Sequence, residues 1–261
     1  MPRWLFVMVA ASVFIRYPAE AGMAGDRIII ADDSDHHLVI LNRDVREELP
    51  HRAPEFGKIG CLSRIGDDEL LVCDGAQFVR IGLDLAERSR TPAGYDRITN
   101  AMSLGSGRIA VGDANRKAVV TIDRLGNELS VIPVHFPSAF IRLSSGNLLV
   151  ADGTSLLKEF DSDGRIVHQT PLESWAASLD VSPSGEMVVG ESRGYESFDA
   201  HRVRLWSRPS QSRVSCVQQL ANNEVFLCEP DAHRLVIVDH DGSVVWEWTT
   251  RGTVWHALVI Q

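Results

Sequence analysis

The chain has 261 residues, of which 44% are hydrophobic and 23% are charged, as is ordinary for a globular protein. Its formal net charge is -9 and no basic run occurs, so nucleic acid is not an expected partner. A chain of this length can bury a sizeable core without metals or disulfides.

The N-terminus has the pattern of a secretory signal. Arg3 supplies a positive charge, residues 4–15 carry none, and Ala19 and Ala21 are small residues of the kind that signal peptidase reads. We expect a signal peptide over 1–21, a domain over 22–261, and a secreted or periplasmic protein. The alternatives are a short N-terminal anchor or a cytosolic protein with an apolar start. Residues 4–15 are too few to span a bilayer comfortably, and no membrane span is expected.

A repeat with a period near 40 residues decides the fold class. Aliphatic residues, then one small residue, then one acid recur six times, and the acids are spaced 42, 39, 39, 39 and 38 residues apart. These acids are Asp32, Asp74, Asp113, Asp152, Glu191 and Glu229. Such a period, rich in β-branched residues and turns, is typical of propeller blades. The sequence therefore predicts an all-β, six-bladed β-propeller of four-stranded blades.

Each repeat contains an inner strand, a second strand that ends at the acid, a third strand and an outer strand. The predicted third strands cover 38–41, 78–83, 119–122, 156–160, 203–206 and 235–238. Turns such as the one ending at Gly126 follow, where glycine provides positive φ. Residues 27–49 hold only the last three strands of a blade, and 254–261 hold only an inner strand. The C-terminus is therefore expected to complete the first blade and close the ring.

Several stretches resemble NHL repeats and, more broadly, the TolB-like six-bladed propellers. The family pattern is Ala-Asp-x-x-Asn-x-Arg before an aliphatic strand. Similar residues here are Ala31-Asp32-x-x-Asp35-His36-His37-Leu38, Asp113-x-Asn115-Arg116 and Glu229-x-Asp231-x-His233-Arg234-Leu235. The stretch Val245-Trp246-Glu247-Trp248 is also similar to quinoprotein-like and arylsulfotransferase-like propeller repeats. These resemblances imply a fold and no particular activity.

The six acids are expected to form a ring on one face of the disc. One interpretation is a cation-binding or electronegative mouth. The other, which we favour, is that each carboxylate bonds its own turn or a nearby arginine, because a residue present in every blade usually serves the blade.

Residues that break the repeat are the better candidates for a specific site. His256 begins the last inner strand and is the candidate catalytic base or metal ligand; a hydrogen-bonded structural histidine is the alternative. Residues 192–201 are interpreted as an enlarged loop on the mouth face, which either contacts a ligand or packs on itself. The candidate ligand-binding residues are Asn100, His135, Trp175, Tyr195, Phe198, His201, Trp255 and His256. No local spacing enforces three or four converging zinc ligands, so no metal site is assigned.

The four cysteines form two pairs with the same spacing. Cys61 and Cys73 are 12 residues apart, as are Cys216 and Cys228, and both pairs occupy the same two positions of the repeat. Opposed residues of an antiparallel hairpin lie within disulfide range. Two intra-blade disulfides are one interpretation. Small buried thiols are the other, because the same positions elsewhere hold Ala139 with Ala151, and Ala177 with Gly190.

The favoured function is an exported binding scaffold that presents one face and its central channel to a protein or small ligand. The alternative is an enzyme that uses the channel: a metal-assisted hydrolase or lactonase, a lyase, or a sulfotransferase-like protein. The cofactor is not predictable from the sequence, and a monomer is expected.

Overall fold

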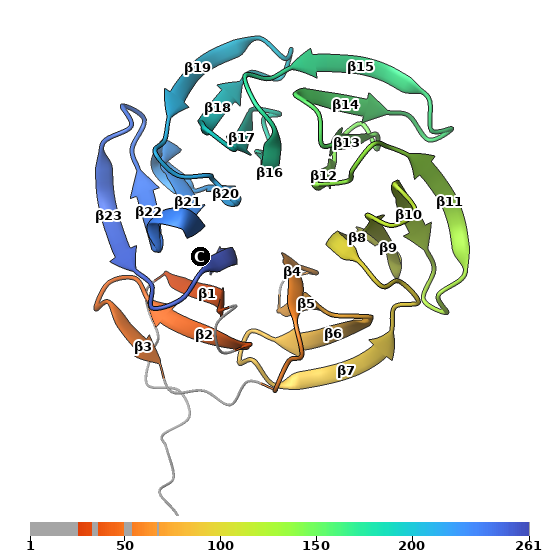
Figure 1. Ribbon diagram of the computed structural model, residues 1–261, viewed down its shortest axis with the longest axis horizontal. Coiled ribbons are helices and arrows are strands. Elements are labelled where there is room, and N and C mark those ends of the chain that lie inside the picture. The colour runs from red at the N-terminus through yellow and green to blue at the C-terminus, as the bar shows by residue number, and fades with distance from the viewer. Residues whose placement is uncertain (1–25, 33–35, 50–53, 67, 261) are drawn as a thin grey trace, which may run out of the picture.

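The structure is a computed structural model that describes residues 26–32, 36–49, 54–66 and 68–260. In these residues, 24 strands form six four-stranded antiparallel sheets that lie radially around a central axis (Figure 1). The predicted six-bladed propeller is confirmed. The predicted signal peptide lies outside the described residues. Within the described part, no helix has the length and hydropathy of a membrane-spanning segment.

The strands of each blade are given from the axis outward. Blade 1 comprises β24 (Val254–Ile260), β1 (Arg27–Asp32), β2 (His37–Asn42) and β3 (Glu47–Leu49). Blade 2 comprises β4 (Ile59–Arg64), β5 (Glu69–Asp74), β6 (Gln77–Gly82) and β7 (Glu87–Pro92). Blade 3 comprises β8 (Ile98–Gly105), β9 (Arg108–Asp113), β10 (Ala118–Ile122) and β11 (Glu128–Pro133).

The second half of the ring continues the same order. Blade 4 comprises β12 (Ala139–Arg142), β13 (Leu148–Ala151), β14 (Leu156–Phe160) and β15 (Ile166–Pro171). Blade 5 comprises β16 (Ala176–Val181), β17 (Met187–Glu191), β18 (Gly194–Phe198) and β19 (Arg204–Pro209). Blade 6 comprises β20 (Cys216–Gln219), β21 (Val225–Glu229), β22 (Arg234–Val238) and β23 (Val244–Thr249), with short 3-10 helices at Ala221–Asn223 and Pro230–Ala232.

The core consists of six layers, each between two neighbouring blades. Ile28 and Ile30 of β1 pack with Phe226 of blade 6, whereas Ile29 of the same strand packs with Leu70 and Val72 of blade 2. Successive side chains of a strand point to opposite faces, so a middle strand between two blades must be apolar on both. This requirement explains the continuous aliphatic runs before the acids.

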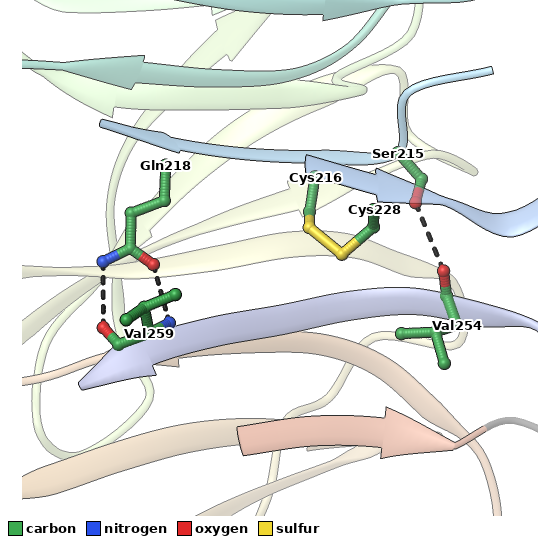
Figure 2. The surroundings of a disulfide bond; sticks show 6 residues. All are labelled: Ser215, Cys216, Gln218, Cys228, Val254 and Val259. Atoms are coloured by element: carbon green, nitrogen blue, oxygen red, sulfur yellow. Dashed lines mark hydrogen bonds between the residues drawn. A yellow bond between two sulfur atoms is a disulfide. The ribbon is translucent and has the colours of Figure 1, made fainter. Parts of the chain in front are cut away.

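The ring closes as predicted, because β24 pairs with β1 in the register Ile28↔Val259 and Ile30↔Ala257. Side chains of β20 reinforce this seam from the other side (Figure 2). The Gln218 amide donates to the Val259 carbonyl at 2.9 Å and accepts from the Val259 N–H at 2.8 Å. Ser215 Oγ donates to the Val254 carbonyl at 3.4 Å. The last blade therefore binds the closing strand through its exposed backbone edge.

Blade 5 departs from the predicted strand assignment. The predicted third strand at 203–206 overlaps β19, the outer strand, and the true third strand is β18. Residues 194–198 are thus part of the sheet and do not form a loop. The error has a physical cause: β18 contains Glu196 and Ser197, two polar residues that are nevertheless fully buried, so its sequence lacks the usual apolar run.

Candidate functional site

All six inner strands border one cavity on the propeller axis, with a volume of about 330 Å³. Its lining is drawn from residues 62–64, 99–102, 138–141, 177–180, 215–218 and 256–258. Ligand sites in proteins have volumes of this order, about 300–1,000 Å³, and a convergence of six strands gives a rigid wall. This axial cavity is the candidate site.

One position of the inner strand recurs in every blade, opposite the small residue that precedes the acid. Its occupants are His256, Cys61, Asn100, Ala139, Ser178 and Cys216. In blade 5 the sequence alignment placed Ala177 there, which is wrong: Ser178 pairs with Gly190, and the register shifts between Ala176 and Ser178. Similar shifts occur in β4, β8 and β24. Such bulges re-aim side chains, so each one changes which residue occupies the position.

Glycines opposite this position make room for the inner-strand side chains. A Cβ on Gly190 would lie 2.3 Å from Ser178 Oγ, and one on Gly112 would lie 2.5 Å from Thr99 Oγ1. Both distances are impossible for a real contact, so these two blades need glycine where others tolerate alanine or cysteine. The small residue of the repeat is therefore a packing requirement of the channel wall.

His256 is uncharged at neutral pH. Removal from water lowers its pKa from 6.5 to about 4, although a hydrogen bond with the Gly60 backbone opposes the shift. A neutral imidazole offers one donor and one acceptor nitrogen. His256 therefore contributes a polar, uncharged group to the cavity wall, next to blade 2.

Two hydroxyl groups of the wall lack protein partners. Ser63 Oγ and Ser178 Oγ are buried and make no hydrogen bond in the structure. A buried polar group without a partner costs about 1–3 kcal/mol, so such groups usually meet water or a ligand. Asn100, also in the lining, is half-buried and adds an amide. The sequence pointed to His256 and Asn100 but gave no signal for the serines, because serine in a strand has no distinctive pattern.

The charged residues of the wall are engaged by backbone. Asp180 accepts hydrogen bonds from the N–H of Gln219 at 2.7 Å and of Val181 at 2.9 Å. Burial raises the pKa of Asp180. Arg64 Nε donates to the Gly66 carbonyl at 3.1 Å. Asp180 and His256 form no hydrogen bond or ion pair with each other, so the described lining of this cavity does not pair its acid with its histidine.

The repeated acids lie at the ends of the second strands and bond groups of their own blades. Five of them are buried, and Asp32 is partly exposed. Asp74, for example, accepts from the N–H groups of Gly57 at 2.7 Å and Lys58 at 3.0 Å. Asp113 accepts from the N–H groups of Asn115 and Arg116, and Asp152 meets Lys158 and Thr154. None of the six belongs to the lining of the axial cavity.

The aromatic candidates lie away from the axial cavity. Tyr195 and Phe198 belong to β18 and are buried between blades, where Tyr195 meets Trp206 edge to face at 5.6 Å. Their assignment to an exposed mouth loop is therefore wrong. His201 lies in the turn from β18 to β19, on the rim opposite the acids, and lines a different hollow with Ser184.

The remaining candidates lie outside the cavity lining. His135 is exposed just before β12, and Trp175 is half-buried just before β16. Trp255 stacks beneath the guanidinium of Arg213, whose Cζ lies 4.8 Å from the ring centroid. Of the predicted ligand-binding residues, the structure brings only His256 and Asn100 into the axial cavity.

Both cysteine pairs form disulfides, with Cα atoms 4.9 Å apart in each. Cys61 and Cys216 occupy the recurring inner position in blades 2 and 6, on either side of the blade that carries His256. Figure 2 shows the Cys216–Cys228 bond between the seam contacts of Gln218, on β20, and Ser215, just before β20. Two covalent cross-links thus stiffen the wall next to His256.

No model of a known protein family matches the chain, and no curated protein matches it either. Solved structures do. A protein of unknown function from Bacteroides caccae is 18% identical, with a TM-score of 0.73 over 91% of this chain and 100% of that one. A chain of a nidogen–laminin complex is 12% identical, with a TM-score of 0.71 over 91% and 99%.

A third similar structure is an enzyme. It is a catalytically inactive histidine-to-alanine variant of virginiamycin B lyase from Staphylococcus aureus with quinupristin, 13% identical, with a TM-score of 0.64 over 88% of this chain and 82% of that one. At such identities the likeness establishes the fold alone. By architecture, the chain is a six-bladed β-propeller of four-stranded antiparallel blades, closed by its C-terminal strand.

Proposed function

We propose that this propeller is a binding scaffold whose axial cavity takes a small, uncharged, polar molecule. The observation that carries the proposal is the pair of uncharged polar side chains in the lining, neutral His256 and the Asn100 amide. Hydroxyl and amide groups of a ligand would hydrogen-bond these two side chains. The charged residues of the lining, Arg64 and Asp180, carry opposite signs and each hydrogen-bonds backbone groups.

The test is calorimetric titration of the purified protein with neutral sugars and simple amides, such as glucose, maltose, N-acetylglucosamine and acetamide. We expect one class to bind, and His256→Ala and Asn100→Ala each to weaken it by about tenfold or more, which is the value of one lost hydrogen bond to a buried group. The control is His168→Ala. It replaces an exposed histidine on β15, which is the outer strand of blade 4. Equal affinity in all three variants contradicts the proposal.

Catalysis in the same cavity is the second candidate: His256 is unprotonated at neutral pH and can accept a proton, and its pKa of about 4 makes it a weak base. The similar fold of virginiamycin B lyase agrees with this candidate without establishing it. Mass spectrometry of the titrated compounds separates the two: unchanged compounds support the scaffold, and a new product that disappears in His256→Ala supports the enzyme.

We further propose that the protein is exported and that it belongs with the NHL or TolB-like propellers. Two disulfides support export, because disulfides persist in oxidising compartments. N-terminal sequencing of the mature protein is expected to begin at Gly22, and a chain that begins at Met1 contradicts export with cleavage.

A further inference from the structure

Unpartnered buried oxygens gather between blades 4 and 5, away from the axial cavity. Six side-chain polar atoms in the described residues are buried without a hydrogen bond, and two of them are the channel serines. The other four are Thr170 Oγ1, Glu191 Oε1 and both carboxylate oxygens of Glu196. Every one of these four atoms is an oxygen, and three belong to carboxylates.

The strand register places these side chains in one layer. Glu196 of β18 pairs with Val189, which packs with Phe198 against Leu157 of blade 4. Glu191 lies two residues after Val189 on β17 and so faces the same way. Thr170 of β15 pairs with Leu157, so it faces blade 5 from the opposite side. The two acids and the hydroxyl thus face the same inter-blade space.

The surrounding charges leave this space negative. Arg204 Nη2 is 3.4 Å from Glu196 Oε1, but its Nη1 is bound to Glu173 at 2.7 Å. Ser174 donates its N–H and hydroxyl to Glu191 Oε2 at 2.6 and 2.7 Å, which leaves Oε1 without a partner. One arginine therefore serves three carboxylates of this cluster.

Two further arginines lie near without neutralising it. Arg193 is exposed, and Arg208 donates to the carbonyls of His240 and Asp241 in the next blade. Glu196 itself is 1% exposed. Burial and the charge of Glu191 raise the pKa of Glu196 to about 7. Among the described residues, Arg204 is the counter-charge within ion-pair distance of Glu196, and it is shared with Glu173, so a further cationic partner would stabilise the two buried acids.

A hollow of about 380 Å³ reaches both acids from the surface. Its lining includes Glu191, Glu196, Ser174, Ser207 and Glu173. The hollow therefore gives an ion a route from the surface to the two acidic side chains.

We propose that Glu191 and Glu196 bind a hard divalent cation of the Ca²⁺ class between blades 4 and 5. Ca²⁺ takes six to eight oxygen ligands in flexible geometry, and carboxylates and waters are its usual donors. Glu191 Oε1 and Glu196 Oε2 provide two anionic ligands from strands β17 and β18 of one blade, and Thr170 faces the same layer from blade 4. This site is independent of the axial cavity and of any function there.

The experiment is calorimetric titration of the chelator-stripped protein with CaCl₂, accompanied by thermal unfolding with and without calcium. We expect one binding event, a rise in Tm of about 5 °C at a hundredfold excess of Ca²⁺ over Kd, and loss of both in Glu196→Gln. Glu191→Gln is the second variant, in case one of them folds poorly. Glu47→Gln, which removes an exposed charge on β3, is the matched control and should behave as the wild type.

Two outcomes overturn the proposal. The first is a wild-type protein whose heat signal and Tm do not respond to CaCl₂, which means that a proton or water satisfies the acids. The second is equal calcium binding by the wild type and both folded glutamine variants, which places the ion elsewhere. Neither result bears on ligand binding in the axial cavity, because Glu191 and Glu196 do not line it.

Discussion

At position 256 an imidazole occupies a place that other blades fill with cysteine, asparagine, alanine or serine. The ring is partly exposed to the cavity but is removed from bulk water, and its pKa falls to about 4. Residue identity alone could not establish this protonation state, because it depends on how much of the neighbouring strands covers the ring. The consequence is a pH dependence of stability with a definite sign.

Because the pKa of His256 is about 4 in the folded protein and 6.5 in its ordinary environment, the unfolded chain binds more protons between these values. The free energy of unfolding should therefore rise as the pH rises from about 4 to about 6.5. The full shift corresponds to about 3 kcal/mol, and we expect about 1–2 kcal/mol because the ring borders the cavity. His256→Gln should remove this part of the pH dependence in urea unfolding at pH 4.5 and 7.

The exposed His168→Gln variant is the control for this measurement. If wild type and His256→Gln lose stability in parallel as the pH falls, burial does not set the charge of His256. The acid-induced loss would then come from carboxylates elsewhere.

At the scale of elements, the hairpin of an inner and a second strand is the unit that varies between blades. Blades 2 and 6 cross-link it with cysteines, whereas blade 4 has Ala139 opposite Ala151 in the same register. The equal spacing of 12 residues allowed both disulfides and small buried thiols, and the structure has the disulfides. Alanine should fit the position without strain, since blade 4 already carries it.

The double replacement of Cys216 and Cys228 by alanine should lower the free energy of unfolding by about 2–3 kcal/mol. The loss arises in the unfolded chain, where a short loop is no longer closed. Urea unfolding in non-reducing buffer measures it, and the difference should vanish in buffer with a reducing agent. A difference that persists after reduction means that packing around the sulfur atoms, and not the cross-link, stabilises blade 6.

Strand assignment at this scale succeeded where the blade follows its apolar pattern and failed in blade 5. There Gly194 allows the chain to turn directly from β17 into β18, and β18 hides Glu196 in the interior. Residues 203–206 contain several apolar residues and therefore resembled a core strand. They lie instead at the outer strand β19, where Val203 and Leu205 are exposed. Apolar patterns in a sequence predict burial on average, and a strand such as β18, which buries an acid, does not follow that average.

At the scale of the whole molecule, the ring depends on one seam. The strand β24 contributes Val254, Ala257 and Val259 to the layer between blades 1 and 6, and Gln218 holds its backbone from β20. Without β24, β1 would have no strand on its axis side, because β1 is second in its sheet. Closure of the ring therefore requires both β1 and β24, the first and last described strands.

Deletion of residues 254–261 should cost more than the stability of one strand. It leaves the inner edge of β1 unpaired and opens an apolar layer, so we expect a loss of cooperative unfolding and a larger radius of gyration in small-angle X-ray scattering. A synthetic peptide of residues 254–261 should restore part of both. The control is Trp255→Ala in the full chain, which keeps the strand. A compact, cooperative truncated protein contradicts closure by β24.

The sequence by itself determined the number of blades, their four-strand order, the closing strand and the pairing positions of the cysteines, because these follow from a period, a side-chain alternation and the complementary ends of the chain. The tertiary structure alone decided the bulges that bring Ser178 into the channel wall, the neutral state of His256, and the buried acids Glu191 and Glu196 between blades 4 and 5. These depend on which blade packs against which, and desolvation and register are set by neighbours that are distant in sequence.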